Sequence, residues 1–292
     1  MDILLTGGGG FIGRHVREHF SPAHRVLSPT HAELDLLDED VVRAYMERHP
    51  VEAVIHCAVR PGHRNAPDPS DQLNRNLRMF HNLARNRSRF GRMIVLGSGL
   101  VYGMDHYRPR MGEDYFDRHV PRDEGGFSKY LIARHIECSE GFVELRPFGV
   151  FGAHEDYAIR FISNAICRTL FDLPITLKQN RKFDYVFVGD LIRVIGHFLD
   201  HGGRHKAYNV TPDRTVELLE LVELVRMLSG KDLPVRVARE GMGTEYSGDN
   251  ARLKAEIPAL DFTPLETAVA GLFQWYLERR DAINRSLLET DP

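Results

Sequence analysis

The sequence predicts an α/β fold, a doubly wound parallel sheet followed by a smaller C-terminal lobe. Short apolar runs alternate with amphipathic patterns through the first half of the chain, and this alternation is typical of a parallel sheet with helices on both faces. A glycine-rich turn separates the first apolar run from the first helical pattern. After Gly152 the pattern changes, which indicates that a second architectural unit begins there.

The elements of the first half follow in order from their apolar patterns. Strands are predicted at residues 3–6, 25–28, 53–58, 93–97 and 143–146. The amphipathic segment 11–20 predicts a helix after the first strand, and Asp38 can cap a second one before the third strand. Another helix is predicted from apolar residues at helical spacing, namely Leu73, Leu77, Phe80 and Ala84. His56, on a buried strand, is expected to be a core residue.

The second half is predicted to be mainly helical. The polar, aperiodic stretch 103–124 predicts a long loop, and loops of this length are usually functional or mobile. Helices are expected at 159–170, 190–199 and 215–228, with a strand at 183–188. Thr263, Pro264 and Glu266 together predict a capping box that opens the last helix. The expected domains are residues 1–152, to which 183–210 returns, and a lobe of residues 153–292.

Composition excludes several classes of function. The 292 residues are 42% hydrophobic, with 38 basic and 41 acidic side chains and a formal net charge of −3, so a basic nucleic-acid-binding surface is not expected. No apolar run is long enough to span a membrane. The three cysteines contain no CxxC pair, which argues against a disulfide framework and a cysteine zinc site. The N-terminus does not resemble a signal peptide. We expect a cytoplasmic protein without metal, membrane or nucleic-acid partners.

The glycine-rich turn predicts a dinucleotide site. Gly7, Gly10 and Gly13 fit the pattern GxxGxxG directly after a strand and at the start of a helix, where a diphosphate can approach the backbone. NAD sites usually carry an acid about 20 residues further on, which binds the ribose 2′-hydroxyl. Residues 26–31 contain none, and Arg14 is available to a 2′-phosphate. NADP is therefore favoured, with NAD as the alternative.

The runs TGGGGFIGRH, AVIHCAV, LGSGLVYG and GFSKY resemble the extended short-chain dehydrogenase/reductases, in particular their NAD-dependent epimerase/dehydratase group. AELDLLDEDVV is similar to the nucleotide-sugar 4-keto reductases. The resemblance implies a Rossmann-type fold, an NAD(P) cofactor, a nucleotide-diphosphate sugar as substrate, and a homodimer. It implies that the cofactor is bound by Gly7, Gly10, Phe11, Ile12, Gly13, Arg14, Asp35, Leu36, Ala58 and Lys129.

The catalytic residues implied by the resemblance are incomplete. Ser98 takes the place of the family's serine, and Lys129 matches its ribose-binding lysine, but the position of the usual proton-donating tyrosine holds Gly125. In the other register, Tyr130 is the tyrosine and Arg134 replaces the lysine. Three interpretations stay open. In the first, another tyrosine donates the proton. In the second, Ser98 or water donates it, at a cost of roughly 10²–10⁴ in rate. In the third, the protein does not catalyse a reaction. The other candidate tyrosines are Tyr130, Tyr102 and Tyr115.

On the substrate side, cationic and amide groups are candidates to hold the nucleotide diphosphate, because arginine binds phosphate bidentately. The candidates are Arg160, Lys178, Arg181 and Asn250. The expected function is an oxidoreductase that reduces a nucleotide-linked 4-keto-(deoxy)sugar for surface-polysaccharide or deoxysugar synthesis. The alternatives are an epimerase or dehydratase that retains NAD, and a cofactor-binding protein whose catalysis is weakened by Gly125.

Overall fold

The computed structural model describes residues 1–60 and 71–289 of the chain. Its first part is built on a six-stranded sheet of order β10-β5-β4-β3-β1-β2, and every neighbouring pair is parallel. The strands are β1 (Asp2–Thr6), β2 (Arg25–Leu27), β3 (Ala53–His56), β4 (Arg92–Leu96), β5 (Phe142–Pro147) and β10 (Ala207–Val210). The five strands predicted in the first half are all present, and the parallel Rossmann-type sheet is confirmed.

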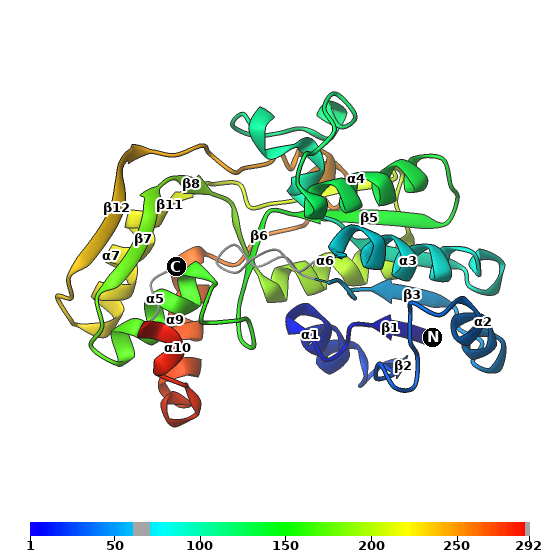
Figure 1. Ribbon diagram of the computed structural model, residues 1–292, viewed down its shortest axis with the longest axis horizontal. Helices are drawn as coiled ribbons and strands as arrows, with labels where there is room; N and C mark the ends of the chain where they lie inside the picture. The colour runs from blue at the N-terminus through cyan, green and yellow to red at the C-terminus, as the bar shows by residue number, and fades with distance from the viewer. Residues whose placement is uncertain (61–70, 290–292) are drawn as a thin grey trace.

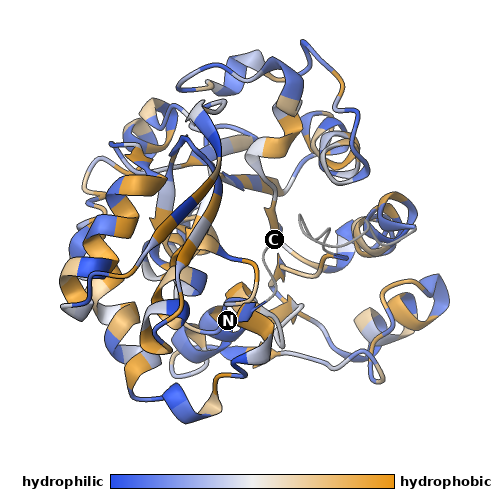
Figure 2. Ribbon diagram, turned by 60° about the vertical axis from the view of Figure 1, so that its left-hand side comes forward, coloured by the Kyte–Doolittle hydropathy of each residue, from blue (hydrophilic) through white to orange (hydrophobic). Residues whose placement is uncertain are grey.

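Helices cover both faces of this sheet (Figure 1). Alternate residues of a strand point to opposite faces, so Leu5 packs with α1 and α6, whereas Leu4 packs with the other helices. One layer contains α1 (Phe11–Phe20) and α6 (Val188–His201), and the other contains α2 (Glu39–Arg48), α3 (Gln72–Ala84) and α4 (Glu124–Glu137). These helices carry both hydrophobic and hydrophilic residues along their length (Figure 2), as amphipathic helices do. Asp38 caps α2 as predicted, and its Oδ1 accepts from the Asp40 and Val41 amides at 2.9 and 3.0 Å.

The second part has its own hydrophobic core, formed by helices and short strand pairs beside the main sheet (Figure 1). Its helices are α5 (Phe161–Leu170), α7 (Leu218–Ser229), α9 (Leu265–Leu277) and α10 (Ser286–Glu289). The paired strands are β6 (Gly149–Phe151) with β9 (Tyr185–Phe187), β7 (Ile175–Asn180) with β12 (Val235–Met242), and β8 (Lys182–Phe183) with β11 (Val216–Glu217). A short helix, α8 (Ala251–Glu256), follows β12 and contacts β10.

Several boundaries in this part differ from the predictions. The strand expected at 183–188 is two strands, because β8 and β9 pair with different partners on either side of Asp184. The predicted helix 215–228 begins only at Leu218, since the residues before it pair with β8. The capping box at Thr263 is wrong: Pro264 is the N-cap of α9, and the Thr263 amide and hydroxyl donate to Asp190 at 3.0 and 2.8 Å. The β7–β12 pair was not predicted.

Candidate cofactor and substrate site

The glycine turn forms a cradle at the start of α1. Gly7 has a φ of +75°, and a Cβ there would lie 2.6 Å from the Ala58 amide nitrogen. A Cβ at Gly13 would lie 2.1 Å from the Gly7 carbonyl oxygen. Both positions therefore require glycine. Gly9, in contrast, faces open space, with no atom within 4 Å of its Cβ position. Backbone N–H groups at a helix N-terminus that border open space suit a diphosphate, and the turn therefore fits a dinucleotide.

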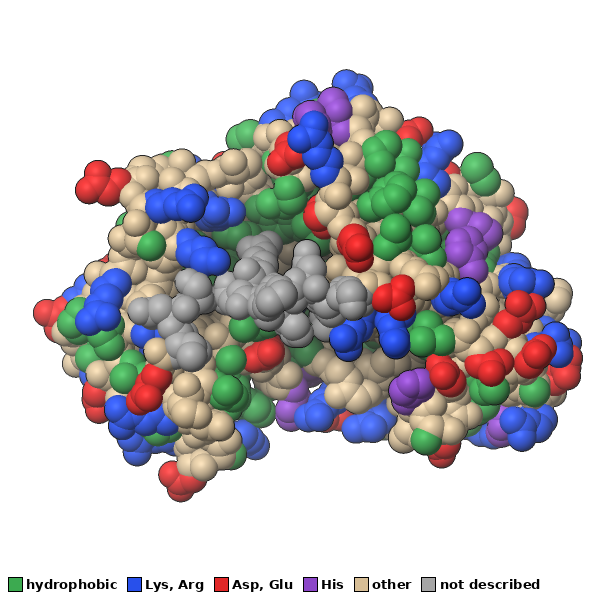
Figure 3. Space-filling view, viewed as in Figure 1, with side chains coloured by type: hydrophobic (Ala, Val, Ile, Leu, Met, Phe, Trp, Pro, Cys, Tyr) green, Lys and Arg blue, Asp and Glu red, His purple; other side chains and the backbone are tan. Residues whose placement is uncertain are grey.

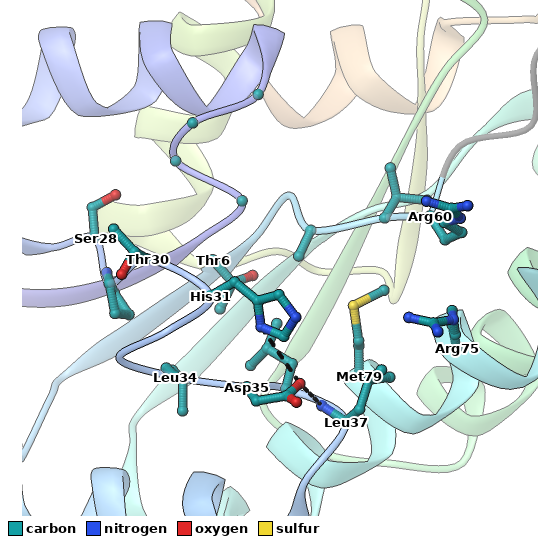
Figure 4. A pocket seen from close by; sticks show the side chains of 18 of the residues that line it. Thr6, Ser28, Thr30, His31, Leu34, Asp35, Leu37, Arg60, Arg75 and Met79 are labelled. Atoms are coloured by element: carbon teal, nitrogen blue, oxygen red, sulfur yellow. Dashed lines mark hydrogen bonds and ion pairs between the residues drawn. The ribbon is translucent and has the colours of Figure 1, made fainter.

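A cavity of about 540 Å³ extends from this turn to the end of β2 and to α3 (Figure 4). Of the predicted cofactor residues, those that line it are Gly7, Gly10, Asp35, Leu36 and Ala58. Those outside its lining are Phe11, Ile12, Gly13, Arg14 and Lys129. Arg14 turns back onto the loop, where its Nε donates to the Gly9 carbonyl at 3.0 Å. Arg17, one helical turn further on, lines the cavity instead.

The cavity wall beyond β2 is formed by hydroxyl and imidazole side chains, namely Ser28, Thr30 and His31. The carboxylate of Glu33 is held by the Thr30 amide and hydroxyl at 2.7 and 2.8 Å, and these hydrogen bonds lower the pKa of Glu33. The Asp35 carboxylate accepts from the Leu37 amide at 2.9 Å and lies 3.7 Å from His31 Nδ1. Both nearby acids are therefore already engaged by protein groups.

Positive charge is available around the same cavity. Figure 4 shows Arg60 and Arg75 on the side opposite Ser28 and Thr30. Arg17 is exposed, and within the part of the chain that the structure describes its guanidinium forms no ion pair. An anionic group beside Arg17 would therefore meet a cation that no described carboxylate pairs, whereas Arg75 already pairs with Asp71, 3.5 Å away.

Ser98 and the Lys129 ammonium both lie at the carboxyl end of β4. The Lys129 ammonium donates to the Leu96 carbonyl at 2.6 Å, and Ser98 follows that strand two residues later. Burial lowers the pKa of Lys129, and the negative charge of Glu144 opposes this effect. His56 is buried, as predicted. Its Nδ1 lies 2.7 Å from the Thr6 hydroxyl, and burial followed by the charge of Lys129 lowers its pKa to about 3.

The tyrosines considered from the sequence have other partners. The Tyr130 hydroxyl donates to Asp117 at 2.5 Å, and that of Tyr102, a buried residue, donates to Asn209 at 2.6 Å. The Tyr115 ring contacts the guanidinium groups of Arg108 and Arg118, which lie 4.5 and 5.2 Å from its centroid. Among the described residues, none of these hydroxyls bonds to Ser98. The hydroxyl next to Ser98 belongs to Tyr246, 148 residues away in the sequence, which sequence reasoning missed because nothing local marks it.

A second cavity, of about 340 Å³, lies against β6, α5 and β7, and the predicted substrate residues Arg160, Lys178 and Arg181 line it. Phe148, Phe183 and other apolar side chains share its wall with polar groups, among them Glu155. Figure 3 shows basic side chains beside a hydrophobic hollow, on its left, on this face of the molecule. Asn250 is outside this lining. Its Nδ2 donates to the Thr211 carbonyl and to Asp213, both at 2.9 Å, so it holds a turn of the backbone.

Comparison with known proteins decides the family. Residues 3–211 match the NAD dependent epimerase/dehydratase family. The chain belongs to this family. It is 26% identical over 283 residues to the GDP-6-deoxy-D-mannose reductase of Pseudomonas aeruginosa, and the alignment covers 86% of this chain and 89% of that protein. It is 25% identical over 328 residues to the UDP-glucose 4-epimerase of Bacillus subtilis, with 94% and 96% of the two chains covered.

Solved structures share the fold. The GDP-mannoheptose C4 reductase MlghC of Campylobacter jejuni, with NADP bound, superposes with a TM-score of 0.82 over 94% of this chain and 98% of that one, at 16% identity.

Within the described residues, no helix is long and apolar enough to cross a membrane. The same residues contain no cluster of His, Cys, Asp and Glu side chains that could hold a metal ion.

Proposed function

We propose that this protein is a reductase that uses NADPH to reduce a nucleotide-diphosphate-linked 4-keto-deoxysugar. The observation that carries the proposal is the wall of the cofactor cavity beyond β2. It offers the hydroxyls of Ser28 and Thr30, and Arg17, which forms no ion pair with the described residues, lines the same cavity from α1. The carboxylates of Glu33 and Asp35 already accept hydrogen bonds from backbone amides. A 2′-phosphate would find hydroxyl donors and positive charge here.

The choice of cofactor bears on the reaction. A reductase consumes NADPH from solution, whereas an epimerase returns the hydride to its own substrate and needs the oxidised dinucleotide first. The curated relative named as a GDP-6-deoxy-D-mannose reductase, similar over most of the chain, supports the reductase. Surface-polysaccharide or deoxysugar synthesis, a cytoplasmic location and a homodimer stay predictions from the resemblance.

Each part of the site has a role in this proposal. The glycine turn would hold the diphosphate of the dinucleotide, and Lys129 would hold the nicotinamide ribose. Arg160, Lys178 and Arg181 would hold the substrate diphosphate in the second cavity. Ser98, at the end of β4, would bond the oxygen of the reacting carbonyl. When bound, the nicotinamide supplies the hydride.

The test is a stoichiometry measurement on the purified protein. Nucleotide-linked 4-keto-6-deoxyhexoses with GDP, UDP and dTDP are each incubated with NADPH, and both the loss of reduced cofactor and the mass of the sugar product are followed. We expect one of these sugars to gain two mass units while NADPH is consumed in equal amount. Interconversion of epimers without net consumption of NADPH would assign an epimerase and overturn the proposal.

A further inference from the structure

Three hydroxyl-bearing side chains gather at the carboxyl end of β4. Ser98 Oγ lies 3.4 Å from Tyr246 Oη. Tyr107, from the long loop after β4, donates its hydroxyl to the Gly99 carbonyl, and its ring centroid is 5.0 Å from that of Tyr246. Neither tyrosine belongs to the helix that carries Lys129.

Tyr246 is held firmly in this position. The segment after β12 crosses back toward the end of the sheet (Figure 1) and pairs with β8. The Tyr246 amide donates to the Lys182 carbonyl at 2.9 Å, and the Tyr246 carbonyl accepts from the Asp184 amide at 3.2 Å. Its ring lies 4.9 Å from Phe148 and 5.7 Å from Phe183 between centroids. Both phenylalanines line the second cavity, so Tyr246 packs against residues of that cavity wall while its hydroxyl lies beside Ser98.

The helix on the other side of Ser98 offers no such group. Gly125, in the first turn of α4, lies one helical turn before Lys129, so a side chain there would share the lysine's face of the helix. Glycine leaves that position without a hydroxyl. The hydroxyl of Tyr130, the tyrosine that follows Lys129, donates its hydrogen bond to Asp117.

We propose that Tyr246, paired with Ser98, is the proton donor of this enzyme, in place of a tyrosine at position 125. The proposal rests on the reductase function proposed above. A bound reduced nicotinamide would supply a hydride, so that its own C–H bond breaks and a C–H bond forms at the sugar carbonyl carbon while the electron pair of the C=O π bond moves onto oxygen. That oxygen takes the Tyr246 proton, so one O–H bond breaks and another forms. The sugar is reduced, the nicotinamide is oxidised, and solvent returns a proton to the tyrosinate.

Tyr107 has a supporting place in this arrangement. Burial and then the neighbouring Tyr246 raise the pKa of Tyr107, so it keeps its proton and donates a hydrogen bond to the Gly99 carbonyl. The Tyr107 ring packs against the Tyr246 ring and holds it in place beside Ser98. Tyr107 is therefore a positioning residue, and Tyr246 the residue that gives up its proton.

The experiment measures kcat and KM for NADPH-dependent reduction of the accepted 4-keto sugar in the full-length protein. Tyr246→Phe removes only the hydroxyl, and we expect kcat to fall about 10²- to 10⁴-fold, with NADPH affinity by calorimetry unchanged. Tyr45→Phe is the matched control, because Tyr45 lies on α2 and packs in the core on the far side of the cofactor cavity; its kcat should stay at the wild-type value.

A rescue variant separates chemistry from structural damage. A Cβ at Gly125 would lie 3.3 Å from Asp123 Oδ1 and 3.4 Å from Gln72 Nε2, side-chain atoms that can shift. Adding Gly125→Tyr to Tyr246→Phe should restore kcat at least tenfold, a gain that repair of packing around position 246 does not explain.

Three outcomes overturn the inference. A wild-type kcat in Tyr246→Phe would show that Tyr246 is not the proton donor, but it would leave the proposed reductase function intact. Loss of kcat in Tyr107→Phe, with Tyr246→Phe unaffected, would assign the proton to Tyr107. Absence of turnover by the wild-type protein with every 4-keto sugar would overturn both this inference and the proposed function.

Discussion

Glu155 offers a pH-dependent test of the second cavity. Its side chain is 5% exposed, and burial raises its pKa to about 8, although the Ser163 hydroxyl and the charge of Arg160 favour the ionised form. A carboxyl group whose pKa is raised in the folded state stabilises the fold fully when the pH is below 4.5, its pKa in the unfolded chain. This stabilisation is lost as the pH rises through about 8, its pKa in the folded protein. Each pKa unit corresponds to 1.36 kcal/mol, so the difference between the unfolded and folded pKa values of Glu155 corresponds to about 5 kcal/mol of stability.

Glu155→Gln replaces the carboxyl group with a neutral one of the same shape. We expect wild type and variant to differ by less than about 1 kcal/mol in the free energy of unfolding near pH 5, and the variant to be more stable by about 5 kcal/mol near pH 9. Urea unfolding at both pH values measures the difference. A difference that does not change with pH would refute a protonated Glu155 in the folded protein.

Three further predictions test the cofactor site. Arg17→Ala should weaken NADPH binding about tenfold and leave NADH binding unchanged, since one charge-assisted contact at an exposed position is lost; calorimetry with both dinucleotides checks this. Gly7→Ala should lower the free energy of unfolding by at least about 1–2 kcal/mol because of its left-handed backbone, whereas Gly9→Ala, with open space at its Cβ, should not change it in thermal unfolding. The His56 ring should give no titration shift between pH 5 and 8 in NMR spectra, because its pKa in the folded protein is about 3. Its burial lowers the stability of the fold only as the pH falls below 6.5, the ordinary pKa of histidine.

Local sequence predicted the sheet well because its strands are short buried runs separated by amphipathic helices. Asp38 shows the same principle at a helix end, since its hydrogen bonds go to amides two and three residues away. β12 was missed because its residues are mostly exposed, so no hydrophobic alternation marks it. Thr263 has the sequence of an N-cap, but a tertiary contact with Asp190 takes its hydroxyl.

The site divides in the same way. The glycine turn, Ser98 and Lys129 follow from local motifs, and the structure places the last two at one strand end. Arg17 could not be distinguished from Arg14 by sequence, because the direction of each guanidinium depends on where the turn folds back. Tyr246 reaches Ser98 only through its pairing with β8, a contact that no local pattern encodes.

Calorimetric titration of the purified protein with NADPH and with NADH tests the central claim most directly, preceded by mass spectrometry of any dinucleotide that copurifies. We predict that NADPH binds at least tenfold more tightly than NADH and that no NAD is retained. Tightly retained NAD, or equal affinity for the two reduced dinucleotides, would contradict a 2′-phosphate site at Arg17, Ser28 and Thr30 and with it the assignment as an NADPH-consuming reductase.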